Sequence, residues 1–376
     1  MPSETRVGKF ESKGVLVTAP TMEVNPEVIE QKIGVVFGAL GGMVTSTMIH
    51  IGNELGLYRA MAGKGPITAA RLAADAGLIE RFVSEWLAQQ AASGIVESRG
   101  GGLFELGPES ALVFADENNP ASQIAFFHYL PSMLELFISS KLAFGSGFGK
   151  TYDAFGEDVA RAMDAGFGAW NRTALVAEAL PKLPGLTDKL SAGAKVADVG
   201  CGAGAGPIAV AQAFPNADVH GYDNSVFALR LAEENKSKAG VANVTFHNPE
   251  NDPLPTIPTF DFVMTLDCLH DMPRPDLCSA AIRQAIKPDG VWFIIDIDGK
   301  GTMEENLQNP MAGFFYGASI ALCLQSASST KDALKLGTFG LPEPKMRDLV
   351  TAAGFSQFRR VEGLVHPFNA YYEVRP

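Results

Sequence analysis

The sequence is poor in positive charge. Its 30 lysine and arginine residues stand against 42 aspartate and glutamate residues, which gives a formal net charge of −12 at pH 7. Proteins that neutralise nucleic-acid phosphates normally need clustered lysine and arginine. The charge balance therefore argues against nucleic acid as a partner.

Cysteine is scarce, and the N-terminal residues have no apolar run. The chain has four cysteines with no C-x-x-C spacing: Cys201, Cys268, Cys278 and Cys323. Small secreted domains depend on dense disulfide frameworks, which this spacing excludes. Residues 1–14 are polar and lack the apolar region of a signal peptide. We therefore expect a cytoplasmic protein with reduced thiols, no metal site and a flexible tail over residues 1–25.

One apolar segment tests the expectation of a soluble protein. Residues 33–49 carry no charge and come close to the shortest length of a membrane span. The segment is rich in glycine, however, and has the Gly34-x-x-x-Gly38 spacing found at close helix contacts. We predict a helix at a homodimer interface, with no membrane partner.

Helix signals follow between residues 66 and 94. Thr68 is a plausible N-cap, Gly77 separates two short helices, and Gly94 ends the second. Two short strands, 95–98 and 103–106, come next around a glycine-rich turn. This order is the outline of a winged helix.

The predicted second helix distinguishes two uses of a winged helix. It offers one cation, Arg81, against the anions Glu80 and Glu85, whereas a DNA-reading helix needs a basic face. A dimerisation domain over residues 26–118 is therefore favoured over DNA recognition. Residues 119–190 are helical and aromatic, and we predict a connector that forms one wall of a pocket.

After Ser191 the pattern changes to short β-branched runs that alternate with helical segments, which predicts a parallel sheet with crossover helices. Strands are predicted at 195–199, 218–222, 243–247, 260–266 and 291–297. A helical insert at about 303–335, a helix near 343–353 and two terminal strands follow. The fold class is thus α/β, with a Rossmann-like domain over residues 191–376.

The segment after the first of these strands, VADVGCGAGAGP at residues 196–207, is a glycine-rich loop. Glycines allow a tight turn and close approach of a ligand, and the following helix N-terminus presents free N–H groups. Asp223 ends the next strand at the spacing, about 20 residues, where a carboxylate meets ribose hydroxyls. Both features fit a dinucleotide as well as S-adenosylmethionine, because Gly200-x-Gly202-x-x-Ala205 also satisfies a relaxed Rossmann fingerprint.

Further segments distinguish these ligands. Together with the glycine loop, LDCLHDM at 266–272 and IKPDGVWFIIDI at 286–297 resemble the motif series of class I S-adenosylmethionine-dependent methyltransferases. GNELGLYRAM at 52–61 and EWLAQQAASGIVE at 85–97 resemble the N-terminal dimerisation winged helix of the small-molecule O-methyltransferase-like family. The bacterial S-methyltransferases of dimethylsulfoniopropionate synthesis are relatives of that branch.

The resemblance implies a cofactor site for S-adenosylmethionine. Asp198, Gly200, Gly202 and Gly204 would hold the methionine portion and the ribose, and Asp223 with Asn224 the ribose hydroxyls. Asn248, Glu250 and Asn251 remain alternatives for the adenine, while Asp267 and Cys268 would flank the methyl donor.

His270 resembles the base of the L-H-D-W motif of plant O-methyltransferases. A neutral imidazole near pH 7 could take a hydroxyl proton as the methyl group transfers, with Asp271 as a candidate orienting group. A histidine that only orders the cofactor loop is the alternative.

The acceptor is expected to be a small molecule, either a hydroxyl compound or a thioether acid such as 4-methylthio-2-hydroxybutyrate. By resemblance, six residues would line its pocket: Tyr129, Tyr152, Trp170, Arg172, Tyr316 and Asn369. Arg172 would bind a substrate carboxylate. An S-adenosylmethionine-sensing transcriptional regulator is the alternative function, and a hydride-transferring dehydrogenase is disfavoured because no second nucleotide-binding half follows.

Overall fold

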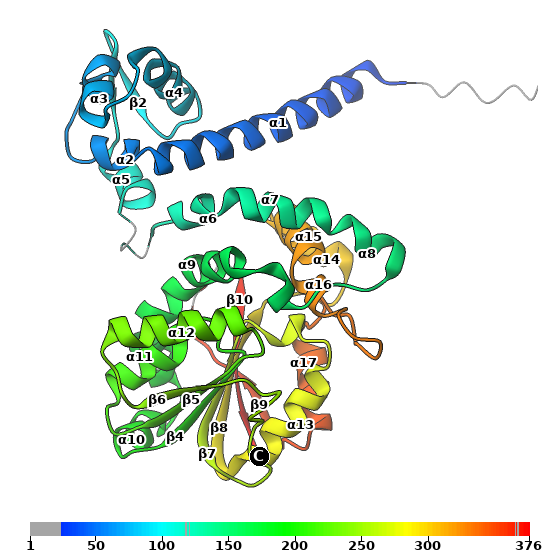
Figure 1. Cartoon of the computed structure of the whole chain (residues 1–376). Coiled ribbons are helices and arrows are strands. Elements are labelled where there is room, and N and C mark those ends of the chain that lie inside the picture. Colours follow the sequence, from blue (N-terminus) through cyan, green and yellow to red (C-terminus); the bar gives the residue numbers. More distant parts are fainter. Residues whose placement is uncertain (1–23, 117–118, 120, 365, 367) are drawn as a thin grey trace, which may run out of the picture. The chain divides into compact units, whose positions relative to one another are not determined.

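The computed structural model describes residues 24–116, 119, 121–364, 366 and 368–376 (Figure 1). Contacts divide the chain into two compact units, residues 1–45 and 46–376. Nearly all of the predicted tail, residues 1–25, lies outside the described part. The division into four parts predicted from the sequence stays a prediction.

Helix α1 (Pro26–Glu54) begins in the first unit and ends in the second. The Asn25 side chain accepts the Glu27 N–H at 2.9 Å, and a proline suits the first helical position. Apolar side chains on the N-terminal part of α1 are exposed, for example Phe37 at 69% and Val35 at 67%. The predicted helix is confirmed, whereas its place in a dimer interface stays a prediction.

Within the described chain, α1 is also the one helix long and apolar enough to cross a membrane. Length and composition alone decide that test, and helices of soluble proteins pass it as well.

The second unit opens with a winged helix. Its elements are α2 (Leu57–Met61), β1 (Ile67–Thr68), α3 (Ala69–Ala76), α4 (Glu80–Ala92), β2 (Glu97–Gly100), β3 (Leu103–Glu105) and α5 (Pro108–Phe114). The Thr68 hydroxyl accepts the Arg71 N–H at 3.2 Å, and Gly77 ends α3 with a φ of 68°. Strand β3 pairs with both β1 and β2. The predicted helix pair and hairpin are confirmed, but β1 is too short to show a pattern in the sequence.

Aromatic residues hold the core of the winged helix together. Trp86 donates its indole N–H to the Met48 carbonyl at 3.0 Å, and the Tyr58 hydroxyl donates to Gln90 at 2.5 Å. Both polar groups need such partners because Tyr58 and Trp86 are buried. The last turns of α1 are thereby tied to α4.

A series of helices then leads to the sheet. They are α6 (Ile124–His128), α7 (Leu130–Ser139), α8 (Lys141–Ser146), α9 (Glu157–Thr173) and α10 (Leu186–Ser191), with the short turns η1 (Tyr152–Phe155), η2 (Leu175–Ala179) and η3 (Leu180–Lys182). The predicted helical character of this segment is confirmed.

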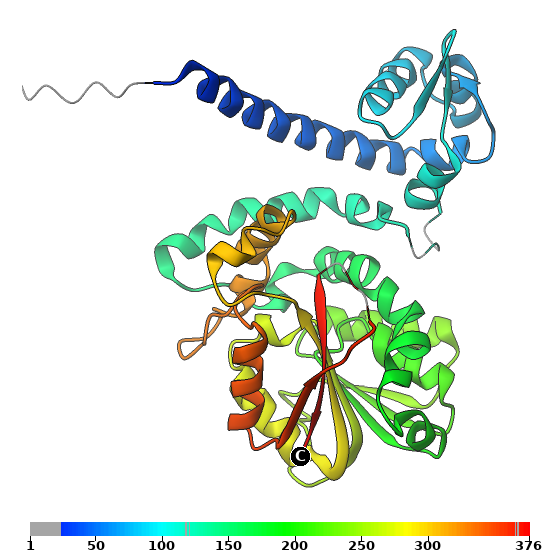
Figure 2. The ribbon, with the colours of Figure 1, turned by 180° about the vertical axis from the view of Figure 1, so that it is seen from behind.

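The second unit is built around a seven-stranded sheet. Its strands are β4 (Lys195–Val199), β5 (Asp218–Tyr222), β6 (Val244–His247), β7 (Phe260–Leu266), β8 (Ile286–Ile297), β9 (Gln357–Arg360) and β10 (Asn369–Arg375), in the order β6-β5-β4-β7-β8-β10-β9. Strands β4 to β8 are parallel, and β10 runs antiparallel to β8 and β9 (Figure 2). The fold is Rossmann-like, as predicted.

Helices cover both faces of this sheet, because its central strands are apolar on both sides. The remaining elements are α11 (Ala205–Ala213), α12 (Val226–Ala239), η4 (Leu269–Asp271), α13 (Pro275–Ala285), α14 (Met303–Asn306), α15 (Ala312–Ala321), α16 (Cys323–Ser326) and α17 (Glu343–Ala352). Residues of α10 and α11 share one core with Phe262 and Phe293 of the sheet. Residues of α13 and α17 share the other core with Val263 and Trp292.

The strand order reverses at β4, which has β5 on one side and β7 on the other. Open α/β sheets bind ligands outside the carboxyl ends of their strands at such a switch point. The loops after β4, β5 and β7 therefore form the first place to look for a site.

Candidate functional site

The loop after β4 depends on glycine at two positions. Gly200 has a φ of 80°, and a Cβ there would lie 2.7 Å from the Cys268 sulfur. Gly204 also has a φ of 80°, and a Cβ there would lie 2.7 Å from the ring of Phe246. A Cβ on Gly202, by contrast, would meet no atom within 4 Å. The loop is thus packed against the rest of the domain at Gly200 and Gly204 and is open at Gly202.

Two buried carboxylates flank this loop. Asp198 is 1% exposed, and its Oδ1 has no hydrogen-bond partner among the described residues. Burial, with the nearby charge of Asp223, raises the pKa of Asp198 well above its ordinary value. A buried acceptor without a donor is costly, so Asp198 is suited to receive a donor group from a ligand.

Asp223, at the end of β5, shapes the same loop. Its Oδ2 accepts the Gly202 N–H at 2.8 Å, and its Oδ1 accepts the Ser225 N–H at 2.9 Å. Burial raises the pKa of Asp223, although these backbone hydrogen bonds oppose the rise. Asn224 is exposed beside it. Asp223 therefore lies against the glycine loop as predicted, while its use by a ribose stays a prediction.

Asn248 follows β6 and closes a turn. Its side chain accepts the Glu250 N–H at 2.9 Å, and its carbonyl accepts the Asn251 N–H at 3.0 Å. The side-chain oxygen is thus already used inside the loop. Which of Asn248, Glu250 and Asn251 contacts the adenine stays open.

Asp267 ends β7 in a strained conformation. Its φ is 60°, unusual for a residue other than glycine, and its N–H donates to the Ile295 carbonyl at 2.8 Å. Asn369, the first residue of β10, hydrogen-bonds its carboxylate. Oδ1 of each side chain has no partner within the described chain. Burial raises the pKa of Asp267 to about 6; His270 opposes that rise, and Asp296 adds to it.

Cys268 has a structural contact. Its thiol donates to the Val199 carbonyl at 3.1 Å, and burial raises its pKa well above the ordinary value. The sulfur fills the space left by the missing side chain of Gly200.

His270 lies in the turn η4 and is 3% exposed. Its Nδ1 donates to Oδ1 of Asp296 on β8 at 2.6 Å, which leaves Nε2 for another partner. Burial alone would lower the pKa of His270, but Asp296 and Cys323 raise it well above 6.5. The role of His270 as a base stays a prediction.

Asp296 is the functional residue that the sequence interpretation missed. It is 1% exposed within the apolar run of β8, and its Oδ2 has no partner in the part of the chain that is described. An aspartate inside an otherwise apolar strand was the available signal, because a buried carboxylate needs a donor. Asp296, not Asp271, orients His270.

Asp271 has a different partner. It is 7% exposed and hydrogen-bonds the hydroxyl of Tyr152 in η1. Burial raises its pKa to about 7, while His270 and Tyr152 oppose the rise. The pKa of the Tyr152 hydroxyl is also raised, by burial and by the charge of Asp271. Tyr152 thus belongs to this cluster, while its contact with a substrate stays a prediction.

The structure pairs the other four predicted substrate contacts with neighbouring side chains; they are Trp170, Arg172, Tyr129 and Tyr316. The Trp170 ring packs near Tyr371, with the ring centres 5.6 Å apart. Arg172 is paired with Asp164 at 2.9 Å, and its use as a carboxylate receptor stays a prediction. The ring centres of Tyr129 and His128 are 4.6 Å apart.

Tyr316 lines a separate cavity of about 320 Å³ between α15 and the segment before α17. Its ring packs against Phe339, with the ring centres 5.0 Å apart. None of the described contacts of Tyr316 joins it to His270. The structure therefore brings together Tyr152, Asp267, His270 and Asn369.

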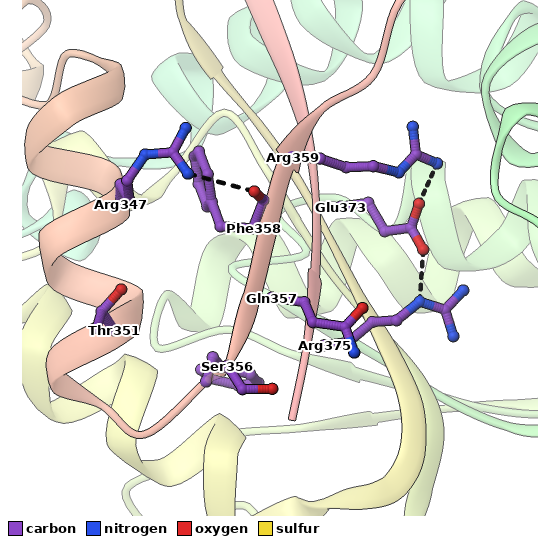
Figure 3. A pocket seen from close by; sticks show the side chains of 9 residues that line it. Arg347, Thr351, Ser356, Gln357, Phe358, Arg359, Glu373 and Arg375 are labelled. Atoms are coloured by element: carbon purple, nitrogen blue, oxygen red, sulfur yellow. Dashed lines mark hydrogen bonds and ion pairs between the residues drawn. The ribbon is translucent and has the colours of Figure 1, made fainter.

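A larger cavity, of about 440 Å³, lies beside α17, the edge strand β9 and its neighbour β10 (Figure 3). Arg359 and Arg375 both bind Glu373, and Arg347 donates to the Phe358 carbonyl at 3.3 Å. The charges that line it are thus paired within the protein. This surface has none of the orphaned acceptors found at the ends of β4, β7 and β8.

Comparisons with known proteins agree with this geometry. A methyltransferase domain model matches residues 190–339, and an Rv2258c-like winged helix-turn-helix domain model matches residues 42–115. No curated protein sequence matches the chain.

Solved structures share the fold over nearly their whole length. A candidate O-methyltransferase from Nostoc punctiforme is 18% identical, with a TM-score of 0.71 over 91% of this chain and 98% of its own. An O-methyltransferase family protein from Burkholderia thailandensis is 16% identical, with a TM-score of 0.65 over 94% and 98%. Human N-acetylserotonin methyltransferase, solved in complex with S-adenosylmethionine, is 18% identical, with a TM-score of 0.63 over 92% and 97%.

The chain therefore contains a methyltransferase domain of Rossmann-like fold and an N-terminal winged helix, and it shares this architecture with solved methyltransferases.

Proposed function

We propose that the chain transfers a methyl group from S-adenosylmethionine to a hydroxyl group of a small molecule. The observation that carries this proposal is the pair His270–Asp296, joined at 2.6 Å beside the switch point of a methyltransferase sheet. Enzymes described as O-methyltransferases among the solved structures support the same choice.

The residues present fit the cofactor. Its amino group would satisfy the orphaned Oδ1 of Asp198, and its ribose hydroxyls would meet Asp223. The open face of Gly202 allows a ligand to approach the backbone. When bound, the cofactor supplies a methyl group on a sulfonium, which leaves as a neutral thioether. Asp267, Asp271 and Asp296 would surround that cation with negative charge.

In this mechanism the chain holds the acceptor and moves one proton. Nε2 of His270 accepts the hydroxyl proton of the acceptor as the oxygen forms its bond to carbon. Asp296 fixes the ring and stabilises the imidazolium that results. Tyr152 and Asn369 would position the acceptor at the same edge of the sheet. Alignment and exclusion of water contribute the remaining acceleration.

S-methylation of a thioether acid is the second chemistry. A thioether has no proton to lose, so His270 would only bind such a substrate. Arg172, the side chain expected to receive its carboxylate, is paired with Asp164. We therefore favour the hydroxyl acceptor.

The winged helix is proposed to act in dimerisation and not in transcriptional regulation. On α4 the only cation, Arg81, is paired with Glu85, which leaves that helix without a free positive charge for phosphates. The protein is accordingly proposed to be a cytoplasmic homodimer that binds neither DNA nor membranes.

An activity screen tests the proposal. The protein is incubated with S-adenosylmethionine carrying a labelled methyl group and with small hydroxy, amino and thioether compounds. Label should move to a hydroxyl compound, with one equivalent of S-adenosylhomocysteine formed per methyl group transferred. Transfer to thioethers alone would contradict the hydroxyl acceptor.

A further inference from the structure

A cysteine faces the histidine of the candidate site. Cys323, at the start of α16, hydrogen-bonds His270. Ligand atoms of His270, Asp271 and Cys323 all lie within 4.8 Å of one another. Neither the methyl-transfer proposal nor the comparisons give Cys323 a role.

We propose that Cys323 is a nucleophilic thiol and a site of covalent modification by soft electrophiles. The proposal uses the same His270–Asp296 pair as the proposed function, but it does not require methyl transfer.

The arrangement of Cys323, His270 and Asp296 is that of an activated nucleophile. A base adjacent to the thiol takes its proton, and a third group holds the base in orientation. The Asp296 carboxylate is bound to Nδ1 of His270 at 2.6 Å and is 1% exposed. Asp296 thereby holds His270 as the base beside the Cys323 thiol.

Another charged group lies beside the same thiol. A carboxylate oxygen of Asp271 is within 4.8 Å of the Cys323 sulfur, and a negative charge there disfavours a second anion. Burial raises the pKa of Asp271 to about 7, so that this carboxyl is partly protonated near neutral pH. Tyr152 donates its hydroxyl to Asp271 and remains neutral.

The other three cysteines have no such partner in the described structure. Burial raises the pKa of Cys278 to about 12, and the pKa values of Cys201 and Cys268 are raised by burial as well. Cys268 donates its proton to a backbone carbonyl. These thiols form an internal comparison for Cys323.

The surroundings of Cys323 define the electrophile. The side chain is half-buried against Leu136, Val159 and Leu322, which favours a small uncharged reagent. With iodoacetamide, the sulfur forms a bond to the carbon that bears iodine, the carbon–iodine bond breaks, and iodide leaves. The thiol proton stays on Nε2 of His270 until it passes to solvent.

Mass spectrometry of peptides from the iodoacetamide-treated protein tests the proposal, without S-adenosylmethionine or acceptor. At pH 7, Cys323 should be labelled at least about tenfold faster than Cys278. Asp296→Asn should slow the labelling of Cys323 by about tenfold at pH 7. Cys278→Ser is the control and should leave the rate at Cys323 unchanged.

Two outcomes would overturn the proposal. One is a Cys323 rate that matches the rate of Cys278, a measurement that needs no variant. The other is one equivalent of bound zinc that is lost in Cys323→Ser, which would make the cluster a metal site. Methyl transfer without selective labelling would refute this inference alone, and selective labelling without methyl transfer would refute only the proposed function.

Discussion

At the scale of single residues, the site is defined by carboxylates that lack donors. Asp198, Asp267 and Asp296 each have a buried oxygen without a partner in the described chain. A buried acceptor left unpaired costs on the order of 1–3 kcal/mol. Three of them at the ends of adjacent strands are difficult to explain by packing, and a bound ligand with N–H and O–H donors would offset that cost.

Asp223 gives the first prediction. Asp223→Ala should weaken S-adenosylmethionine binding by about 1–3 kcal/mol, because the ribose loses an acceptor and the Gly202 N–H loses its 2.8 Å partner. Titration calorimetry measures the change. Asn224→Ala, at the exposed neighbouring position, is the matched control for a general disturbance of the loop. Equal affinities for wild type and Asp223→Ala would remove Asp223 from the site.

The second prediction concerns the protonation of His270. Asp296 raises its pKa, so kcat/KM should increase with pH along a limb that is displaced upward from that of an ordinary histidine. In Asp296→Asn the limb should move to lower pH, because burial, which lowers the pKa of His270, then acts without the carboxylate. The maximal rate should fall by about 10²–10⁴-fold if His270 has lost its orientation. An unchanged limb would show that another group titrates.

The same shift has a consequence for stability. The folded-state pKa of His270 lies above its unfolded value of about 6.5. Its contribution to the free energy of unfolding is therefore fully present below about pH 6.5 and is lost as pH rises through the folded-state pKa. Urea unfolding at pH 6 and pH 9 should show a smaller pH dependence for Asp296→Asn than for wild type.

At the scale of elements, a side-chain bridge joins α9 and α12 to the glycine loop. Asn235 donates to the Ala203 carbonyl and to Asp164, each at 3.1 Å, and Asp164 also binds Arg172 at 2.9 Å. Arg172 is thus linked through Asp164 to this bridge.

Removing the centre of this bridge gives a third prediction. Asn235→Ala leaves two acceptors unpaired and should lower the free energy of unfolding by about 1–3 kcal/mol. Asn216→Ala is the control, because its amide donates to a carbonyl at the exposed surface and should cost less than about 0.5 kcal/mol. Urea denaturation measures both. Equal losses would mean that the bridge adds nothing beyond an ordinary surface contact.

Elements with a strong local pattern could be predicted from the sequence, and partners across long separations could not. The runs that became β4, β5 and β7 have the predicted bounds, because short runs with β-branched and aromatic residues alternate there with helical segments. The contact of His270 with Asp296 joins residues on different elements, and nothing in local spacing reports it. The pair of Arg172 with Asp164 could not be predicted either, because Asp164 lies two turns away on the same helix and no pattern required the pair.

At the scale of the whole molecule, α1 gives a prediction about assembly. Its exposed apolar side chains form a continuous patch, which is unfavourable in contact with water. We expect a second copy of the chain to bury this patch in a dimer interface. A Cβ on Gly38 would meet nothing within 4 Å in one chain. Gly38→Phe should therefore weaken the dimer without disturbing the fold of a single chain.

Light scattering at several protein concentrations measures this effect. Wild type should be a dimer, Gly38→Phe should dissociate at a higher concentration, and Gln31→Ala, a polar position on the same helix, should behave as wild type. A wild-type monomer would contradict the account of α1. A native protein that leaves the membrane fraction only with detergent would do so as well.

The central claim is that the switch point of the sheet binds S-adenosylmethionine, and the glycine loop by itself would also suit a dinucleotide. Titration calorimetry of the purified protein with S-adenosylmethionine, and in parallel with NAD, tests the claim most directly. The account predicts one molecule of S-adenosylmethionine bound per chain and no binding of NAD. Binding of NAD, or no binding of S-adenosylmethionine, would contradict it.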